Sequence, residues 1–329
     1  MARGEFYEVA CVREALQGPV PSVTPQFFKS GEIDWKATGN VIEAMVAGGA
    51  KSLLVTNGDS LLTILTDKET MEFNRFVAEV AGKRAMVIAC SKAWCQAQLL
   101  DYAATCKEYG CDLVIPFVPD WAQSVDGEEL TACFREIGQV MPVMLLTNMC
   151  NGRGMAYSTI DALRKEEGIV AIKDDMPGPY GKMLLARTRD RFAFLQGGRA
   201  FHFLDQAPFG ADGYLSVYAR VFPHISHLFW RYYTEGRLQE AVEVVEKYDV
   251  AFFDFVAAEG VNFSAAIQGM YEIAGLGRRW RRSPYSSLTE EQMEKLGAFL
   301  EERKLVPEKA PLWQLIFPKR HYIVKMGGG

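Results

Sequence analysis

Short apolar runs alternate with longer amphipathic stretches along the first two thirds of the chain. The short runs lack the alternation of apolar and polar residues that marks a half-exposed strand, and uninterrupted apolar runs are typical of strands buried on both faces. The pattern predicts eight strands, at residues 18–23, 51–56, 85–90, 112–117, 142–147, 168–173, 192–197 and 213–217.

Helical patterns separate these strands, for example at 34–49, 67–82 and 94–110, and each of these three ends in a glycine, as helix C-caps commonly do. Eight strand-helix units in about 200 residues have the number and size of a (β/α)8 TIM barrel. A doubly wound open sheet is the alternative, but no GxGxxG motif follows the first strand. The sequence therefore predicts an α/β fold of the TIM-barrel type.

The pattern changes after residue 217, where only helices are predicted, at about 219–235, 237–256, 262–275 and 289–303. We therefore expect a barrel with an N-terminal extension over residues 1–218 and a C-terminal helical subdomain over 219–303. The prolines that follow favour an extended tail over 304–329.

Charge and composition narrow the class of partner. The chain has 329 residues, 49% of them hydrophobic, and 36 Lys+Arg against 41 Asp+Glu give a net charge of -5. No basic field favours nucleic acid or an anionic membrane, and the one basic run, at 277–287, is interpreted as a solvated face or a subunit contact. No apolar stretch is long enough to predict a membrane span.

Seven cysteines without a CxxC pair favour a reducing, cytoplasmic location. The absence of HxH and HExxH motifs disfavours a metal site, and we expect no cofactor.

The segment "GIVAIKDD" at 168–175 ends a predicted buried strand with Lys173. Active sites of TIM barrels lie at the C-terminal ends of the strands, and a desolvated lysine there has a lowered pKa and can attack a carbonyl to form a Schiff base. The structural alternative is that Lys173 extends to solvent and pairs with Asp174 or Asp175.

A polar turn, "VTNGDS" at 55–60, ends the second predicted strand. The hydroxyl of Thr56, the amide of Asn57 and the backbone N–H groups around Gly58 could together hold a carboxylate. The alternative is an ordinary connection between a strand and a helix.

The order and spacing of several segments resemble the dihydrodipicolinate synthase and N-acetylneuraminate lyase family. These segments are the polar turn, the lysine strand, "GGRAFHFLDQAPFGADGYLSV" at 197–217 and "NFSAAIQGMYEIAGLG" at 262–277. The resemblance implies a TIM barrel with a C-terminal helical subdomain that forms homo-oligomers, dimers or tetramers, and acts as a class I aldolase or lyase.

The resemblance also implies roles for individual residues. Lys173 would form the Schiff base with pyruvate or another 2-oxo acid. Thr56 and Asn57 would bind the carboxylate of the substrate, and Arg153 and Leu215 would bind other parts of it.

The chain departs from the family where the family has two proton-relaying tyrosines. One of them ends the fifth strand, and counting along "LLTNMCNGRG" places either Leu146 or Thr147 there, depending on the direction of the count. The other follows the fourth strand, where this chain has Phe117 and Val118. This argues against dihydrodipicolinate synthesis. The candidates to move protons are, in falling order, Thr147 with a bound water, Asp174 or Asp175, Cys150 and Tyr214.

The sequence therefore predicts a Schiff-base-forming lyase, an aldolase or dehydratase, that acts on pyruvate or a keto-deoxy sugar acid. Lys173 and Thr147 are its predicted catalytic residues. The alternative is a catalytically silent homologue that binds a metabolite or regulates another protein. It is suggested by the missing tyrosines, while the retained Lys173 weighs against it.

Overall fold

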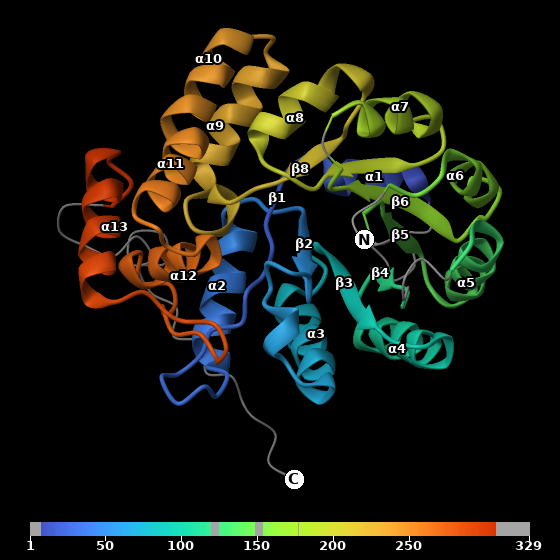
Figure 1. Ribbon diagram of the computed structural model, residues 1–329, viewed down its shortest axis with the longest axis horizontal. Helices are drawn as coiled ribbons and strands as arrows, with labels where there is room; N and C mark the ends of the chain where they lie inside the picture. Colours follow the sequence, from blue (N-terminus) through green and yellow to red (C-terminus); the bar gives the residue numbers. More distant parts are fainter. Residues whose placement is uncertain (1–7, 120–124, 149–153, 177, 307–329) are drawn as a thin grey trace.

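The computed structural model describes residues 8–119, 125–148, 154–176 and 178–306. Eight parallel strands follow one another in the order β1-β8-β7-β6-β5-β4-β3-β2 and curve into a barrel (Figure 1). The barrel is completed between its two end strands, where Ser22 pairs with Leu54 and the Val23 N–H donates to the Leu54 carbonyl at 2.9 Å. The strands are Gly18–Val20, Ser52–Val55, Met86–Ala93, Leu113–Phe117, Val143–Leu146, Ile169–Asp174, Ala193–Gln196 and Gly213–Leu215. The predicted TIM barrel is confirmed.

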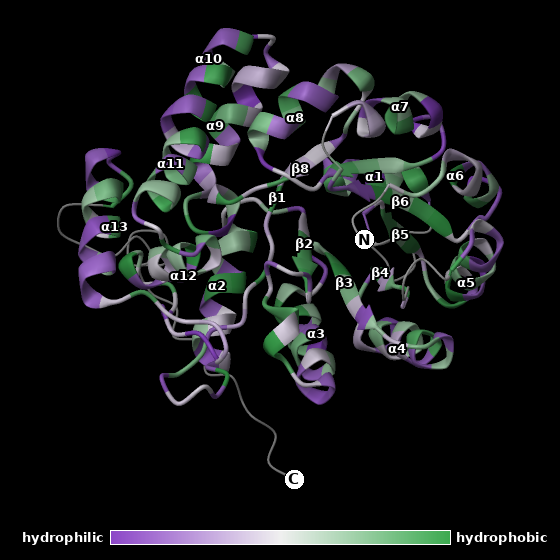
Figure 2. Ribbon diagram, in the orientation of Figure 1, coloured by the Kyte–Doolittle hydropathy of each residue, from purple (hydrophilic) through white to green (hydrophobic). Residues whose placement is uncertain are grey.

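The strands are apolar because both of their faces are buried. Leu54, Ile88 and Ile115 belong to one cluster inside the barrel, whereas Val55 and Val87, the neighbours of Leu54 and Ile88, belong to the layer between the barrel and its helices. Figure 2 shows the strands largely green and the outer faces of the surrounding helices largely purple. The two-sided burial removes the polar alternation that a half-exposed strand would need.

The helices between the strands form the outer layer. The helices predicted at 34–49, 67–82 and 94–110 are present, each within two residues of the expected bounds. Helix α3 begins with a capping box in which Thr66 and Glu69 satisfy each other's backbone N–H groups. The helices from α2 to α8 are Trp35–Ala47, Asp67–Ala81, Gln96–Tyr109, Gly127–Val140, Tyr157–Leu163, Pro179–Thr188 and Ala200–Gln206.

A short helix that the sequence pattern does not predict, α1 (Val9–Leu16), precedes the first strand. Its Val12 and Leu16 join the cluster inside the barrel, and Arg13 donates to the Phe192 carbonyl at 2.8 Å. Eight residues give just over two turns, too few for a helical period to stand out in the sequence. The helix closes the N-terminal end of the barrel, so the open end is the one at which the strands terminate.

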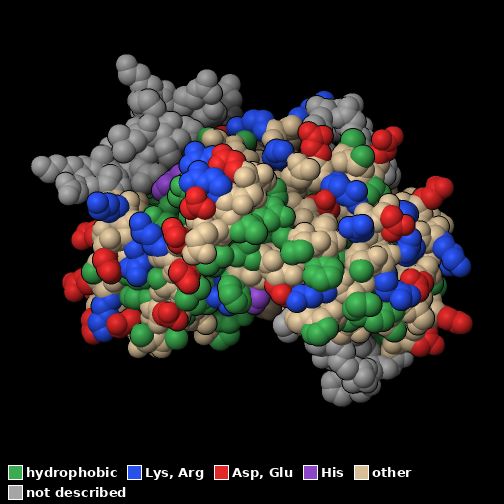
Figure 3. Space-filling view, turned by 90° about the horizontal axis from the view of Figure 1, so that it is seen from above, with side chains coloured by type: hydrophobic (Ala, Val, Ile, Leu, Met, Phe, Trp, Pro, Cys, Tyr) green, Lys and Arg blue, Asp and Glu red, His purple; other side chains and the backbone are tan. Residues whose placement is uncertain are grey.

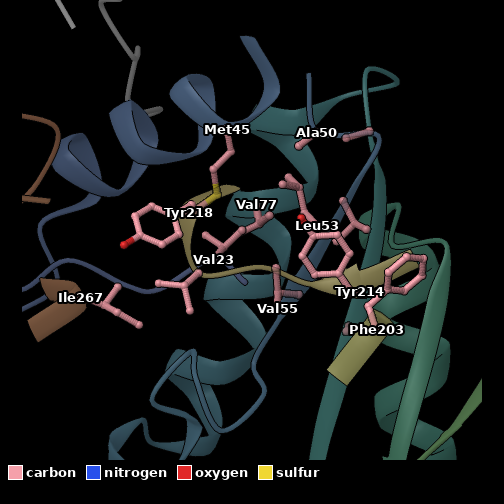
Figure 4. Packing of buried hydrophobic residues seen from close by; sticks show 14 of the residues in the cluster. Val23, Met45, Ala50, Leu53, Val55, Val77, Phe203, Tyr214, Tyr218 and Ile267 are labelled. Atoms are coloured by element: carbon pink, nitrogen blue, oxygen red, sulfur yellow. The ribbon is translucent and has the colours of Figure 1, made fainter. Parts of the chain in front are cut away.

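Between β8 and residue 306 the described chain forms helices and no further strand, as predicted. The α-helices are α9 (Pro223–Thr234), α10 (Leu238–Val244), α11 (Ala251–Ala258), α12 (Phe263–Ile273) and α13 (Glu290–Glu302), with a π-helical segment, Val245–Val250, joining α10 to α11. Tyr218, just after β8, lies near Met45 and Val23 in Figure 4, so this part of the chain packs on α2 and the start of the barrel. Most of the predicted tail, residues 307–329, lies outside the described residues.

No single helix among the described residues is long and apolar enough to cross a membrane. The required length and apolar composition are reached only by two consecutive helical segments taken together, Leu238–Ala258 and Phe263–Ile273, which are bent by 113° relative to each other.

The basic run at 277–287 is tied to the rest of the chain by ion pairs. Arg278 pairs with Asp34 at 2.6 Å, and Arg282 pairs with Glu69 of α3 at 2.8 Å. Arg279 pairs with Glu290 at the start of α13. The run therefore fixes the loop between α12 and α13 against the barrel, which differs from the expected solvated face.

Candidate active site

Lys173 lies near the end of β6, with Leu146 of β5 and Leu195 of β7 as its partners in register. The residue is 5% exposed, and its Nζ forms an ion pair with the carboxylate of Asp175. It borders a cavity of about 170 Å³ at the open end of the barrel. The other residues around this cavity are Asn57, Gly58, Asp59, Cys90, Ile115, Phe117, Leu146, Asp175, Gly197 and Leu215. The ammonium group is therefore buried and paired beside the cavity rather than extended to solvent.

The turn after β2 forms the polar side of the cavity. The Asn57 side chain is held in place by hydrogen bonds at both ends of its amide. Its Oδ1 accepts from the N–H and the hydroxyl of Ser60 at 2.9 and 2.7 Å, and its Nδ2 donates to the Ser22 hydroxyl at 3.0 Å. Leu215, at the end of β8, lies on the same cavity. The structure thus brings together Lys173, Asn57 and Leu215, three of the residues singled out in the sequence.

Asp59, in the same turn, is paired with Arg220, which is 2% exposed. Burial acts to raise the pKa of Asp59, but the charge and hydrogen bond of the Arg220 guanidinium outweigh it and leave that pKa below its usual value. The carboxylate on this wall is therefore neutralised by a buried arginine, so it repels an anionic ligand less than a bare carboxylate would.

Thr56 keeps its place at the strand end, but its hydroxyl does not line the cavity. The hydroxyl donates to the Cys90 carbonyl at 2.6 Å and accepts from the Cys90 N–H at 3.1 Å. Its φ of 50° is unusual for a β-branched residue, and these bonds to β3 hold the backbone in that conformation. The expectation that the Thr56 hydroxyl binds the substrate carboxylate is therefore corrected, and of the pair only Asn57 borders the cavity.

Thr147 is also directed away from the cavity. Its hydroxyl donates to the carboxylate of Asp174 at 2.6 Å, and Gln206 of α8 donates to the other oxygen of that carboxylate at 2.7 Å. Burial raises the pKa of Asp174 despite these hydrogen bonds. The structure contradicts Thr147 as a proton carrier, since its hydroxyl is occupied between the barrel and its helices. Leu146, its neighbour, faces the cavity instead.

No tyrosine among the described residues borders this cavity. Leu146, Ile115 and Phe117 form an apolar wall of the cavity. Of the two residues that counting along β5 offered for the tyrosine position, Leu146 is therefore the one that faces Lys173, and Thr147 is not. Tyr214 points out of the barrel toward Phe203 of α8 (Figure 4), which removes it as a relay candidate. Arg153 and Cys150 lie outside the described residues.

Asp175 and Gly197 both border the cavity, although the sequence ranked Asp175 below Thr147 as a proton carrier and did not single out Gly197. A Cβ on Gly197 would overlap Asp175 Oδ1 and would lie 2.6 Å from Lys173 Nζ, so the glycine leaves the room that the ion pair occupies. Strand side chains alternate between faces, which places Lys173 and Asp175 on one side and Asp174 on the other. That alternation was the available signal for Asp175, whereas nothing in the sequence marks Gly197.

A second cavity, of about 140 Å³, adjoins the first, and both are bordered by Asp175 and Gly197. Its other walls come from the ends of β6 and β7 and from α8: Met176, Gly178, Gln196, Gly198, His202, Asp205 and Gln206. Burial, and then the nearby Arg199, lower the pKa of His202, so its imidazole is neutral near pH 7. Asp175 thus lies between the two cavities.

The first cavity offers a buried amine, a neighbouring carboxylate and a polar turn opposite apolar side chains. Its volume is that of five or six waters at about 30 Å³ each. In the part of the chain that the structure describes, no three His, Cys, Asp or Glu side chains are grouped to hold a metal ion. The arrangement suits a small carbonyl compound with a carboxylate, attacked by the lysine.

The chain is similar to known proteins over most of its length. The family model described as "Dihydrodipicolinate synthetase family" matches residues 15–303. The 4-hydroxy-tetrahydrodipicolinate synthase of Bdellovibrio bacteriovorus is 27% identical over 289 residues, which cover 84% of this chain and 94% of the relative. The enzyme of the same name from Aquifex aeolicus is 28% identical over 70% of this chain and 79% of its own length.

Solved structures share the fold at lower identity. N-acetylneuraminate lyase from Fusobacterium nucleatum superposes with a TM-score of 0.78 at 14% identity, covering 89% of this chain and 100% of the lyase. Dihydrodipicolinate synthase from Oceanobacillus iheyensis gives a TM-score of 0.78 at 19% identity, with 90% and 99% covered.

Proposed function

The chain belongs to the dihydrodipicolinate synthetase family of class I, Schiff-base-forming lyases, and we propose that it is an aldolase or dehydratase acting on a 2-oxo acid through Lys173. The observation that carries the proposal is the buried amine on a cavity at the open end of the barrel. A charged amine in such surroundings is costly unless it is paired or used, and an attack on a carbonyl requires access to a bound ligand.

The substrate proposed is pyruvate or a keto-deoxy sugar acid. The turn at Asn57 and Gly58 would receive the carboxylate, and Leu215 would pack against the carbon chain. Pyruvate has six non-hydrogen atoms, which agrees with a cavity of five or six water volumes. A longer substrate would extend toward the loops after β4 and β5, and Arg153, in the second of these, is kept as a proposed contact for its far end.

We further propose that the reaction is not dihydrodipicolinate synthesis. Support comes from Leu146 and Phe117, which face the cavity with apolar side chains at the places where the family's phenolic relay is expected. A phenol can pass a proton and these side chains cannot.

The chain is also proposed to form a homo-oligomer in the cytoplasm. Met183, Phe201 and Phe209, on α7, α8 and the turn after α8, are large exposed hydrophobic side chains on contacting elements. Figure 3 looks onto the side of α7–α10 and shows hydrophobic side chains gathered near the middle of that face. Each of the six described cysteines is free, which suits a reducing compartment. Light scattering on the purified protein tests the oligomer.

The test of the function is reductive trapping. The purified protein is incubated with pyruvate and sodium borohydride, and intact mass and peptide mapping locate the adduct. We expect a reduced adduct on Lys173 and none in Lys173→Ala, with Lys68→Ala, on the exposed face of α3, as the matched surface control. If neither pyruvate nor a panel of larger 2-oxo acids gives an adduct, while such an acid still raises the melting temperature, the chain is a silent binding homologue.

A further inference from the structure

Asp175 is the acidic group in direct contact with the lysine. Its carboxylate forms the ion pair with Lys173 Nζ, and its side chain is 25% exposed against 7% for that of the lysine. It borders both the cavity that holds the amine and the second cavity next to it. An acid in this position can reach a ligand bound to Lys173 on one side and exchange protons on the other.

The neighbouring carboxylate, that of Asp174, has a different environment. It accepts hydrogen bonds from Thr147, from Gln206 and, at 3.2 Å, from the Met176 N–H, and it has no exposed surface. A Cβ on Gly181 would overlap both Asp174 Oδ2 and Gln206 Nε2, so α7 also packs closely against it. Asp174 is therefore a structural acceptor that joins β6 to β5 and α8.

The other titratable groups on the amine's cavity are less suited to carry protons. Asp59 is paired with Arg220, which holds its pKa low and keeps it charged. Burial raises the pKa of the Cys90 thiol above its ordinary value, so the thiol stays protonated. Asp175 is thus left, among the described groups that line this cavity, as the one placed to take up and return a proton.

We infer that Asp175 is the proton carrier of the lysine chemistry, with a carboxylate in the role that other members of the family give to phenols. This inference rests on the proposed Schiff-base function. It assigns the catalytic pair as Lys173 and Asp175, with Gly197 as the residue that makes room for it.

The steps balance as follows. Asp175 takes a proton from the Lys173 ammonium, the free amine attacks C2 of the 2-oxo acid, and the carbonyl oxygen takes the proton back from Asp175 to give a carbinol. The carboxylate then removes a second proton from nitrogen. The nitrogen lone pair expels the hydroxyl, which leaves as water with that proton. The product is a protonated imine and an ionised Asp175.

The same carboxylate would then remove a proton from C3. The C3–H electron pair becomes the C2=C3 double bond, and the imine electrons move to nitrogen to give an enamine. The proton now on Asp175 can leave through the second cavity, whose wall includes the neutral imidazole of His202 and the carboxylate of Asp205.

The experiment separates imine formation from proton transfer at carbon. Wild type, Asp175→Asn and Lys173→Ala are incubated with pyruvate in deuterated buffer. NMR follows deuterium entering the methyl group, and borohydride trapping measures the imine in parallel samples. The exchange rate is divided by the trapped fraction, and Asp161→Asn, which removes a carboxylate from a surface ion pair, is the matched control.

We expect Asp175→Asn to form imine more slowly, as the steps above require, and to exchange at least about 100-fold more slowly per trapped imine, the usual contribution of a positioned general base. Exchange per imine within a few-fold of wild type would overturn the assignment. If the asparagine variant forms no imine, the same measurements are made on Asp175→Ala with added formate, a small carboxylate that can occupy the place of the missing side chain. Restored trapping and exchange support the inference, and no restoration refutes it. A wild type that is never trapped would refute the proposed function itself, and the inference with it.

Discussion

Gly197→Ala is the sharpest test of how the site is assembled, because it adds one methyl group where the Lys173–Asp175 pair lies. The new Cβ would overlap Asp175 Oδ1 and lie 2.6 Å from Lys173 Nζ, whereas ordinary contact begins at 3.4 Å. The amine must therefore withdraw by about 0.8 Å, and the carboxylate by more. The adjoining cavity gives Asp175 a direction in which to move.

The expected effect is large on reactivity and modest on stability. A misplacement of about 1 Å at a reacting group can lower the rate about 100-fold, and we expect a loss of that size in the rate of borohydride trapping with pyruvate. An added methyl in a packed site costs about 1–3 kcal/mol, and the room beside Asp175 points to the lower end. The variant should therefore remain folded at assay temperature.

The assay is a time course of trapping by intact mass, with the melting temperature measured on the same samples. Gly297→Ala is the matched control, since nothing lies within 4 Å of the Cβ it would add and it sits within α13. We expect that variant to react as wild type does. Trapping by Gly197→Ala at the wild-type rate would show that the pair tolerates displacement, and the reasoning about room for it would be wrong.

Two other predictions concern groups outside the cavity. Hydrogen bonds from Arg282 lower the pKa of Glu69 from 4.5 to about 2, so the ionised pair stabilises the fold above pH 4.5 and that stabilisation is lost as pH falls toward 2. The shift corresponds to about 3 kcal/mol of unfolding free energy, and screening by solvent at this partly exposed pair reduces it to about 1–2 kcal/mol. In urea unfolding, Glu69→Gln should lose that free energy at pH 7 and progressively less of it below pH 4.5. Thr147→Val should keep imine trapping within a few-fold of wild type but lose about 1–3 kcal/mol, because Asp174 loses a buried donor; a 100-fold loss of trapping would restore Thr147 to the mechanism.

The strands and the lysine could be predicted because their signals are local. An apolar run that ends in a lysine describes β6 without reference to any other part of the chain. The orientations of Thr147 and Thr56 could not be predicted in this way. Whether a residue at a strand end faces the barrel interior depends on the register with its neighbours, and a shift of one residue exchanges Leu146 for Thr147. At Thr56 the left-handed backbone, held by bonds to Cys90, also decides where the hydroxyl points.

The energetics of the cavity argue that it is a functional feature and not a by-product of the fold. The side chains around the cavity of about 170 Å³ forgo the packing contacts that a filled barrel end would give them. A buried ion pair adds little stability compared with apolar side chains of similar volume. An apolar residue that filled the cavity in place of Lys173 would therefore give a barrel at least as stable. A site that only bound a 2-oxo acid could use the turn at Asn57 without the amine. A carboxylate next to the amine is needed when the amine must lose a proton, attack a carbonyl and pass protons on. The pairing of Lys173 with Asp175 therefore favours the lyase over the silent homologue.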